Sequence, residues 1–385
     1  LSLRRQRQMC IRDRYIYDGD TPSSVRQIAR KEGRLIVTNP DMLHSGILPN
    51  HPKWVKIFNG LRYIVIDELH TYRGIFGSHL AHVISRLLRI AKFYNSSPII
   101  IATSATIQNP KELFTAITGR EPVLIDKSGA PQGEKHYIIY NPPFVDPQQG
   151  IRRGVVLESC RVARRFIEEG HQTIVFARSR LNTEIILSYL KQWIPAKRNQ
   201  IEGYRGGYLP NERRAIERGL KEGSILGVVS TNALELGIDI GGMDVSIMAG
   251  YPGSVASFHQ QAGRSGRKVS TSVAILITSN SPLDQYIAAH PEYLIQKSPE
   301  SALINPKNIY ILVDQVKCAA FELPFAENEK LGDEEIADVL EYLEDKNVLH
   351  REDGKYHWQE RSYPAENISL RSADTGNFVI VDRTD

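Results

Sequence analysis

The chain has 385 residues, of which 41% are hydrophobic and 24% charged, and no apolar run in the sequence is long enough to span a bilayer. This length predicts two or three domains, each able to bury a core. The net charge of +4 is too small to indicate a nucleic-acid partner by itself. The three cysteines, Cys10, Cys160 and Cys318, are too scattered for a disulfide framework or a zinc site and fit a reducing compartment.

Both ends of the sequence look irregular. Residues 1–14 are basic, lack apolar periodicity and do not begin with Met, so we treat them as a non-native or disordered leader outside the fold. At the other end, the apolar run 378–382 resembles a strand with nothing after it to pair with. We therefore expect a chain that is truncated at both ends.

The first half of the sequence alternates strands and helices. Residues 15–22 predict a strand end and a turn, 23–32 a short helix with Ser23 as its cap, and 35–38 a strand. The apolar run 63–66 predicts a strand buried on both faces. A helix at 78–93 and a strand at 99–102 follow, and this repetition indicates a doubly wound parallel sheet in an α/β fold.

A stretch rich in Gly, Pro and Gln, 129–150, predicts a linker, after which the α/β pattern resumes. Strands are expected at 173–176, 225–229, 245–248 and 272–278, with helices at 181–193 and 210–222. Helices at 308–321 and 333–346 and a hairpin at 348–358 then suggest a winged-helix module, because Asp353-Gly354 is a hairpin turn signal. The expected domains are 15–135, 136–297, 298–365 and the start of another domain at 366–385.

Two adjacent carboxylates, Asp67 and Glu68, follow the strand at 63–66. In an open α/β sheet the ligand crevice lies at the carboxyl ends of the strands. An acid pair in this position could hold Mg²⁺ and orient a water for phosphoryl transfer. The alternative is that Asp67 and Glu68 are only a solvated pair at the start of a loop. The motifs later in the chain decide in favour of the catalytic interpretation.

The segment Gln260-Gln-Ala-Gly-Arg-Ser-Gly-Arg267, called here the arginine turn, places Arg264 and Arg267 three residues apart with glycines between them. Arginine suits phosphate because its guanidinium is planar, always charged and bidentate. An arginine that reaches a γ-phosphoryl group stabilises the charge of the transition state. The alternative is a basic surface loop.

Other motifs are weaker on their own. Thr231 and Asn232 at a strand end could donate to a nucleic-acid phosphate, and so could the hydroxyl and amide of Thr38 and Asn39, although helix capping explains each equally well. Further candidates, each with an ordinary structural alternative, are Gly237, Asp239, Ser104, Thr106, Arg178, Arg180 and His70.

A phosphate-binding loop of the form Gly-x-x-x-x-Gly-Lys-Ser/Thr does not occur in the sequence; the only Gly-Lys pair is Gly354-Lys355, in the predicted hairpin. In a parallel NTPase lobe this loop precedes the acidic strand. We therefore expect it to lie ahead of Tyr15 in a longer protein, and this chain alone to be inactive as an ATPase.

Taken in order, the motifs resemble those of superfamily-two helicases of the DEAD/DEAH type. The segments Tyr17-Asp-Gly-Asp-Thr-Pro22, Thr38-Asn-Pro-Asp-Met-Leu-His44, Asp67-Glu-Leu-His-Thr-Tyr-Arg-Gly74 and Gly250-Tyr-Pro-Gly253 are similar to the MrfA branch of bacterial DNA-repair helicases and to its RecQ-four-like fungal and archaeal relatives. The resemblance runs from about Tyr15 to the end.

The resemblance implies two RecA-like lobes, the first incomplete, with ATP between them, a winged helix, and 3′→5′ movement on DNA at a junction of single strand and duplex. It implies that Asp67 holds the Mg²⁺ of ATP and that Glu68 activates water. His70, Ser104 and Thr106 would couple hydrolysis to motion, and the implied contacts with phosphates and nucleotide are Gln260, Arg264, Arg267, Gly237 and Asp239. The implied DNA contacts are Thr38, Asn39, Arg178, Arg180, Thr231 and Asn232.

The family also implies a bacterial cytosolic monomer without a membrane segment, a nuclease partner in repair, and zinc bound only by cysteines absent from this chain. His259 stands where we expect Trp. Two alternatives stay open. One is a DEAD-box RNA helicase, against which His70 argues because those proteins carry Asp there. The other is a non-enzymatic nucleic-acid-binding module.

Overall fold

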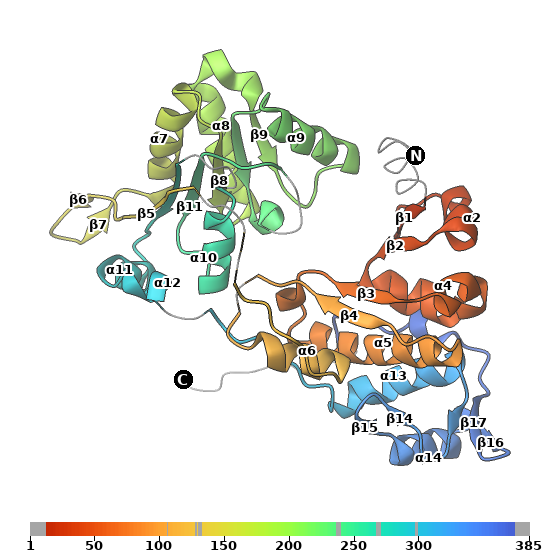
Figure 1. Cartoon of the computed structure of the whole chain (residues 1–385). Helices are drawn as coiled ribbons and strands as arrows, with labels where there is room; N and C mark the ends of the chain where they lie inside the picture. Colours follow the sequence, from red (N-terminus) through yellow and green to blue (C-terminus); the bar gives the residue numbers. More distant parts are fainter. Residues whose placement is uncertain are drawn as a thin grey trace. The chain divides into compact units, whose positions relative to one another are not determined.

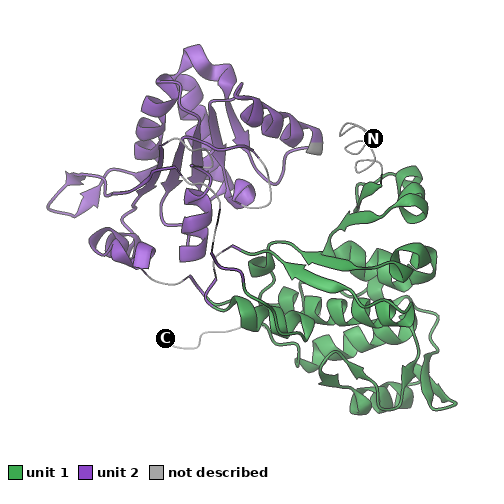
Figure 2. Ribbon diagram, in the orientation of Figure 1, with its two compact units in different colours: residues 1–104, 109–124, 301–385 green, residues 105–108, 125–300 purple. Residues whose placement is uncertain are grey.

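The structure is a computed structural model that describes residues 13–105, 107–127, 129, 133–235, 240–266, 271–296 and 299–373. Two compact units, coloured separately in Figure 2, make up the chain. Unit 1 comprises residues 1–104, 109–124 and 301–385, and unit 2 comprises residues 105–108 and 125–300. The segment that follows residue 300 therefore packs with the N-terminal part of the chain.

Unit 1 begins with two pairs of parallel strands, β1 with β2 and β3 with β4 (Figure 1). Its first elements are β1 Arg14–Tyr17, α2 Ser23–Glu32, β2 Leu35–Thr38, α3 Pro40–Met42, η1 Leu43–Ile47, η2 Leu48–Trp54, α4 Val55–Asn59, β3 Tyr63–Ile66, η3 Leu69–Thr71, α5 Gly74–Phe93, β4 Ile99–Ala102 and α6 Pro110–Thr118. The strands predicted at 35–38, 63–66 and 99–102 are confirmed.

Three expectations for unit 1 are wrong. Arg14, assigned to the leader, is the first residue of β1. The residue at the cap of α2 is Pro22 rather than Ser23, and no side chain caps this helix. Strand β3 is buried on one face only: Ile64 and Ile66 are buried, whereas Tyr63 and Val65, which point to the opposite face of the strand, are 58% and 63% exposed.

The segment after residue 300 completes unit 1 and has the expected winged-helix elements. They are α13 Ile309–Glu322, β13 Phe325–Ala326, β14 Lys330–Leu331, β15 Glu334–Glu335, α14 Ala337–Asp345, β16 Leu349–Glu352, β17 Lys355–Trp358 and η6 Pro364–Glu366. The hairpin of β16 and β17 turns at Asp353 and Gly354, whose φ angles of 49° and 71° fit a type I′ turn. Residues up to Ser372 pack on α5, where His79 Nε2 contacts the carbonyl of Ser372 at 2.9 Å.

A buried polar cluster joins α5 to α13. The guanidinium of Arg86 is fully buried and forms an ion pair with Glu322, and its Nη1 donates to Gln315 Oε1 at 2.8 Å and to His44 Nδ1 at 2.7 Å. His82, also buried, donates from Nε2 to the carbonyl of Pro306 at 2.8 Å. Burial, reinforced by the charge of Arg86, lowers the pKa of His44 to about 3 and that of His82 to about 4.

These two histidines predict that acid destabilises unit 1. Between pH 6.5 and about 4 the unfolded chain binds protons that the buried neutral imidazoles do not, so the free energy of unfolding should fall as the pH is lowered through this window. We expect a lower urea midpoint at pH 5 than at pH 7. Tryptophan fluorescence in a Trp193→Phe background measures it, because Trp54 and Trp358 then report unit 1 alone. His82→Gln should reduce the pH dependence, whereas His290→Gln, at an exposed site, should leave it unchanged.

Unit 2 contains a six-stranded parallel sheet in the order β5-β12-β11-β8-β10-β9. Its strands are β5 Lys135–Tyr140, β8 Thr173–Ala177, β9 Ile201–Tyr204, β10 Gly227–Ser230, β11 Val245–Ala249 and β12 Ser272–Ile277, and a separate hairpin is formed by β6 Phe144–Asp146 and β7 Ile151–Arg152. The helices are α7 Val155–Glu168, α8 Arg180–Trp193, η4 Pro195–Gln200, α9 Pro210–Glu222, η5 Asn232–Leu234, α10 Val255–Ala262, α11 Pro282–Ala289 and α12 Glu292–Gln296.

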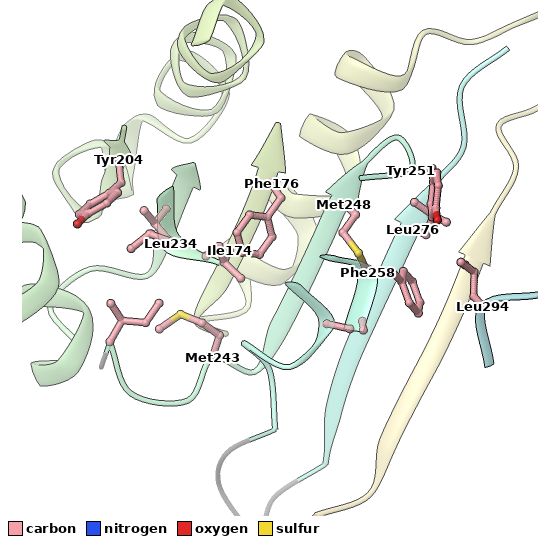
Figure 3. Close-up of a cluster of buried hydrophobic side chains, with 14 of the residues drawn as sticks. Ile174, Phe176, Tyr204, Leu234, Met243, Met248, Tyr251, Phe258, Leu276 and Leu294 are labelled. Atoms are coloured by element: carbon pink, nitrogen blue, oxygen red, sulfur yellow. The ribbon is translucent and has the colours of Figure 1, made fainter. Parts of the chain in front are cut away.

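Helices cover both faces of this sheet, as the doubly wound prediction requires. One face, drawn in Figure 3, carries Ile174, Phe176 and Met248 and packs against Phe258 of α10 and Leu294 of α12. The opposite face packs against α7 and α8. The linker predicted at 129–150 is wrong from residue 135 onward, since this stretch holds the edge strand β5 and the strand β6. Its Gly, Pro and Gln content reflects a hairpin rather than a flexible connection.

Candidate active site

The acid pair lies where the sequence places it, directly after β3 at the carboxyl end of the strand. Asp67 Oδ1 accepts hydrogen bonds from the Thr103 hydroxyl and from the backbone N–H of Glu68, the latter at 3.0 Å. Thr103 follows β4, the neighbouring strand, and its N–H donates to the carbonyl of Ile66 at 2.9 Å. The ends of both strands therefore fix the orientation of the Asp67 carboxylate, which is itself exposed.

Glu68 has a left-handed backbone conformation, with φ 53° and ψ 47°. This conformation is uncommon for a residue other than glycine, asparagine or aspartate and is often found at functional sites. The turn is stabilised by Thr71, whose N–H and hydroxyl donate to the Glu68 carbonyl at 2.9 and 2.8 Å. The buried His70 ring lies 3.5 Å from Glu68 Oε2, so the two residues that the sequence assigned to catalysis and coupling are in contact.

The chemistry of this strand end fits a Mg²⁺ ion that is bound together with phosphate. Oδ1 of Asp67 is occupied by two donors, and among the described residues no hydrogen bond reaches Oδ2. The described residues also hold no cluster of three or more His, Cys, Asp or Glu side chains able to form a metal cage. Mg²⁺ is typically held by one or two carboxylates with substrate phosphates and waters, so one oriented carboxylate is sufficient. The negative charges of Asp67 and Glu68 add to burial in raising the pKa of Tyr72.

In unit 2, α10 carries Gln260 and leads into the arginine turn, of which residues 260–266 are described. The Arg264 side chain is only 4% exposed, and its Nε and Nη2 donate to the carbonyl of Glu235 at 3.1 and 2.6 Å. The Glu235 carboxylate accepts from Ser257 Oγ at 2.7 Å and from Gln261 Nε2 at 2.9 Å. Arg264 thus connects this turn to the loop after β10.

The proposed nucleic-acid contacts of unit 2 follow two neighbouring strands of the sheet. Arg178 and Arg180 come after β8, and Thr231 and Asn232 come after β10; both pairs lie at the carboxyl edge. Both arginines are exposed. Thr231 accepts from the N–H of Ala233 at 3.4 Å and caps η5.

Comparison with known proteins places these features in a family. Residues 3–113 match the model described as DEAD/DEAH box helicase, residues 158–269 the helicase conserved C-terminal domain, and residues 304–373 the winged helix domain of ATP-dependent helicase HRQ1. The chain is 58% identical to the ATP-dependent helicase YprA of Bacillus subtilis over 96% of this chain and 50% of YprA. The chain belongs to the YprA/MrfA family of ATP-dependent helicases.

Two further relatives agree with this assignment. The ATP-dependent helicase HRQ1 of Saccharomyces cerevisiae is 39% identical over 96% of this chain and 35% of HRQ1. A crystal structure of the helicase MrfA bound to DNA and AMPPNP matches with a TM-score of 0.91 and 56% identity, over 99% of this chain and 53% of that chain. The chain thus spans about half the length of YprA and of MrfA.

Within this family assignment, some predicted residues are placed and others are not. Thr38 donates its hydroxyl to the Tyr17 carbonyl at 2.7 Å, and Asn39 Oδ1 accepts from the N–H of Met42 at 2.8 Å and caps α3, so both have structural roles. Ser104 is exposed next to Thr103. The remaining four predicted residues, Thr106, Gly237, Asp239 and Arg267, lie outside the described residues.

Sequence reasoning missed residues that shape the YprA/MrfA-type site. Thr103, which orients Asp67, could have been found from the sequence, because it directly follows the strand β4, which pairs with β3. Glu235 is an acid between Leu234 and Leu236, in the sequence between the predicted site residues Asn232 and Gly237. Lys135 gave no signal, since its partners lie more than a hundred residues away. At His259, the expected Trp position, the ring contacts Phe258 edge-on with centroids 5.3 Å apart.

Lys135 stabilises the arginine turn through hydrogen bonds to its backbone. Its ammonium group donates to the carbonyls of Ala262 and Ser265, the latter at 2.8 Å, and burial lowers its pKa to about 8. Lys135→Met should remove the donor of the Ser265 carbonyl and one of the donors of the Ala262 carbonyl, which keeps those from Ser265, and should raise amide exchange at Ser265 and Gly266 about tenfold. Hydrogen-exchange mass spectrometry tests this prediction.

The control is Lys197→Met, because Lys197 also donates to two backbone carbonyls in unit 2, those of Ile167 and Glu168. It should leave the exchange of the arginine turn unchanged. Equal exchange in Lys135→Met and the parent protein would show that Lys135 does not hold this turn.

Proposed function

We propose that this chain is the motor portion of an ATP-dependent DNA helicase that moves 3′→5′ along one strand. The observation that carries the proposal is the acid pair after β3, where Thr103 and the N–H of Glu68 orient the Asp67 carboxylate. The similarity to MrfA, which has been crystallised with DNA and AMPPNP, supports DNA and ATP as ligands.

In this proposal each residue has a defined task. Asp67 would bind Mg²⁺, and Glu68 would orient the attacking water and accept its proton. The residues that would contact the phosphates of ATP are Gln260, Arg264 and Arg267. Gly237 and Asp239 would lie near the nucleotide. Bound ATP with Mg²⁺ supplies the phosphoryl group whose transfer to water drives motion. His70, which contacts Glu68, and Ser104 and Thr106, which follow β4, couple the state of the acid pair to movement of the chain.

DNA is bound mainly through its backbone. Arg178 and Arg180 would pair with phosphates, while Thr231, Asn232 and Asn39 would donate hydrogen bonds that set the register without reading bases. Thr38, whose hydroxyl donates to the Tyr17 carbonyl, would hold the strand end beside Asn39 in place for this contact. Gly250, after β11, has a φ of 92°, and a Cβ there would lie 3.1 Å from Arg178 Cδ. A side chain at this position would therefore displace Arg178.

The wider assignments follow the same proposal. We propose a monomer in the bacterial cytosol that acts in DNA repair with a nuclease partner and carries zinc only in a region beyond this chain. Among the described residues, the helices are too short or too polar to cross a membrane. An RNA helicase and a non-enzymatic binding module remain the competing functions.

A chimera in which this chain replaces the matching half of B. subtilis YprA tests the proposal. We expect ATP hydrolysis stimulated by single-stranded DNA, and unwinding of a DNA duplex with a 3′ tail but not of one with a 5′ tail. The chain alone is the control and should not hydrolyse ATP, since its sequence contains no phosphate-binding loop. Unwinding of RNA but not DNA would favour the RNA helicase, and DNA binding without hydrolysis by the chimera would favour the binding module.

A further inference from the structure

The hairpin of β6 and β7 in unit 2 has no role in the function proposed so far. It follows β5 and precedes α7, and in Figure 1 it projects away from the sheet and the helices of unit 2. Three of its apolar side chains are exposed: Phe144 by 47%, Val145 by 66% and Ile151 by 44%. Exposed aromatic and β-branched residues on one protruding element indicate a binding surface.

Several contacts make this hairpin a defined structure. The turn is organised by Asp146, whose Oδ1 accepts from the N–H groups of Gln148 and Gln149 at 2.9 and 3.2 Å. Gly150 closes the turn with a φ of 68°. At the base, Arg152 Nη1 donates to the Pro142 carbonyl at 2.8 Å. The Phe144 ring is therefore presented on a rigid support.

The positive charge of the hairpin indicates that its ligand is a polyanion rather than a basic protein. The Arg152 guanidinium lies over the Phe144 ring, 3.7 Å from its centroid. Arg153, the next residue, is ion-paired with the buried Glu158 carboxylate at 3.5 Å, so Arg152 carries the positive charge beside the ring. The only carboxylate within the hairpin, that of Asp146, is used by the turn. An aromatic ring next to an arginine is the combination that single-stranded nucleic acid binds by stacking and by charge.

The position of the hairpin relative to the six-stranded sheet also favours a nucleic-acid ligand. Tyr140, Ile277, Ala249 and Ala177 are in register across β5, β12, β11 and β8. The segment that leads to the hairpin follows Tyr140, the last residue of β5, and Arg178 follows Ala177, the last residue of β8. Both segments therefore begin at the carboxyl edge of the sheet. Three strand spacings separate these two points, or roughly 14 Å, a distance that a few nucleotides of one strand can span.

We propose that the β6–β7 hairpin binds DNA at the junction of single strand and duplex, with Phe144 stacking on the terminal base pair and Val145 as the adjacent apolar wedge. This inference rests on the proposed helicase function and adds the element that separates the strands. Apolar side chains that enter a base step unstack it, and Arg152 beside Phe144 would hold a flanking phosphate.

The test uses a forked DNA with a 3′ tail and 2-aminopurine in its first base pair. Binding of the full chain should raise 2-aminopurine fluorescence, because the base loses its stacking partner. Phe144→Ala should abolish most of this rise, whereas Phe144→Trp, which keeps a ring, should retain it. Gln149→Ala, at the exposed tip of the same turn, is the matched control and should behave as the parent chain.

The YprA chimera gives a second readout. Phe144→Ala should slow duplex unwinding about tenfold while ATP hydrolysis stimulated by single-stranded DNA changes less than twofold. Unchanged fluorescence and unwinding in Phe144→Ala would overturn the proposal and leave the hairpin as a protein-docking element. If the parent chimera lacks ATP hydrolysis, the helicase function fails, and the fluorescence experiment on the chain alone still decides whether the hairpin opens the fork.

Discussion

Replacing Glu68 by glutamine in the YprA chimera should lower the rate of ATP hydrolysis by about 10²- to 10⁴-fold, the usual contribution of a general base. Glutamine has nearly the same shape, so the left-handed turn at this position and the hydrogen bonds from Thr71 to its carbonyl should persist. What is lost is the negative charge that accepts a proton from water. Because Asp67 is untouched, binding of ATP and Mg²⁺ should be retained.

Steady-state hydrolysis and the affinity for a fluorescent ATP analogue measure these two effects separately. Glu112→Gln is the matched control, since Glu112 is an exposed glutamate in the first turn of α6, and it should hydrolyse ATP at the parent rate. Hydrolysis within threefold of the parent rate in Glu68→Gln would remove Glu68 from the catalytic step. A parallel loss of nucleotide affinity would instead assign it to binding.

The second large effect is on stability. Arg86→Met should lower the free energy of unfolding of unit 1 by about 3–5 kcal/mol, because it leaves the Glu322 carboxylate buried without its partner. Gln315 and His44 lose a hydrogen-bond donor in the same change. Urea denaturation followed by fluorescence in the Trp193→Phe background measures the loss.

Removing both charges separates the ion pair from simple packing. Arg86→Met combined with Glu322→Leu should recover at least about 2 kcal/mol, since a buried pair replaced by apolar residues of similar size is often neutral or stabilising. The control is Arg371→Met, which breaks an exposed ion pair with Asp41 and should cost less than about 1 kcal/mol. A double variant as unstable as Arg86→Met would show that the shape of the guanidinium, rather than unpaired charge, matters here.

Local patterns predicted much of the secondary structure and the central motifs. Four-residue apolar runs rich in β-branched residues located β2, β3 and β4, although each of these strands has one exposed face. The same patterns misread β5 and the β6–β7 hairpin as a linker, since Gly, Pro and Gln occur in tight turns as well as in flexible chain. The hairpin gave no alternating apolar pattern, since Phe144, Val145 and Ile151 are all exposed.

The sequence by itself determined the family, the acid pair Asp67-Glu68 and the arginine turn, because these depend on residue types at short spacing. Only the tertiary structure decided that Thr103 orients Asp67, that Lys135 supports the arginine turn, and that the winged helix joins the first unit through Arg86 and Glu322. The physical reason is range: spacing along the chain encodes helices, strands and turns, whereas the partner of a buried polar group is selected by whichever distant segment folding brings within hydrogen-bond distance.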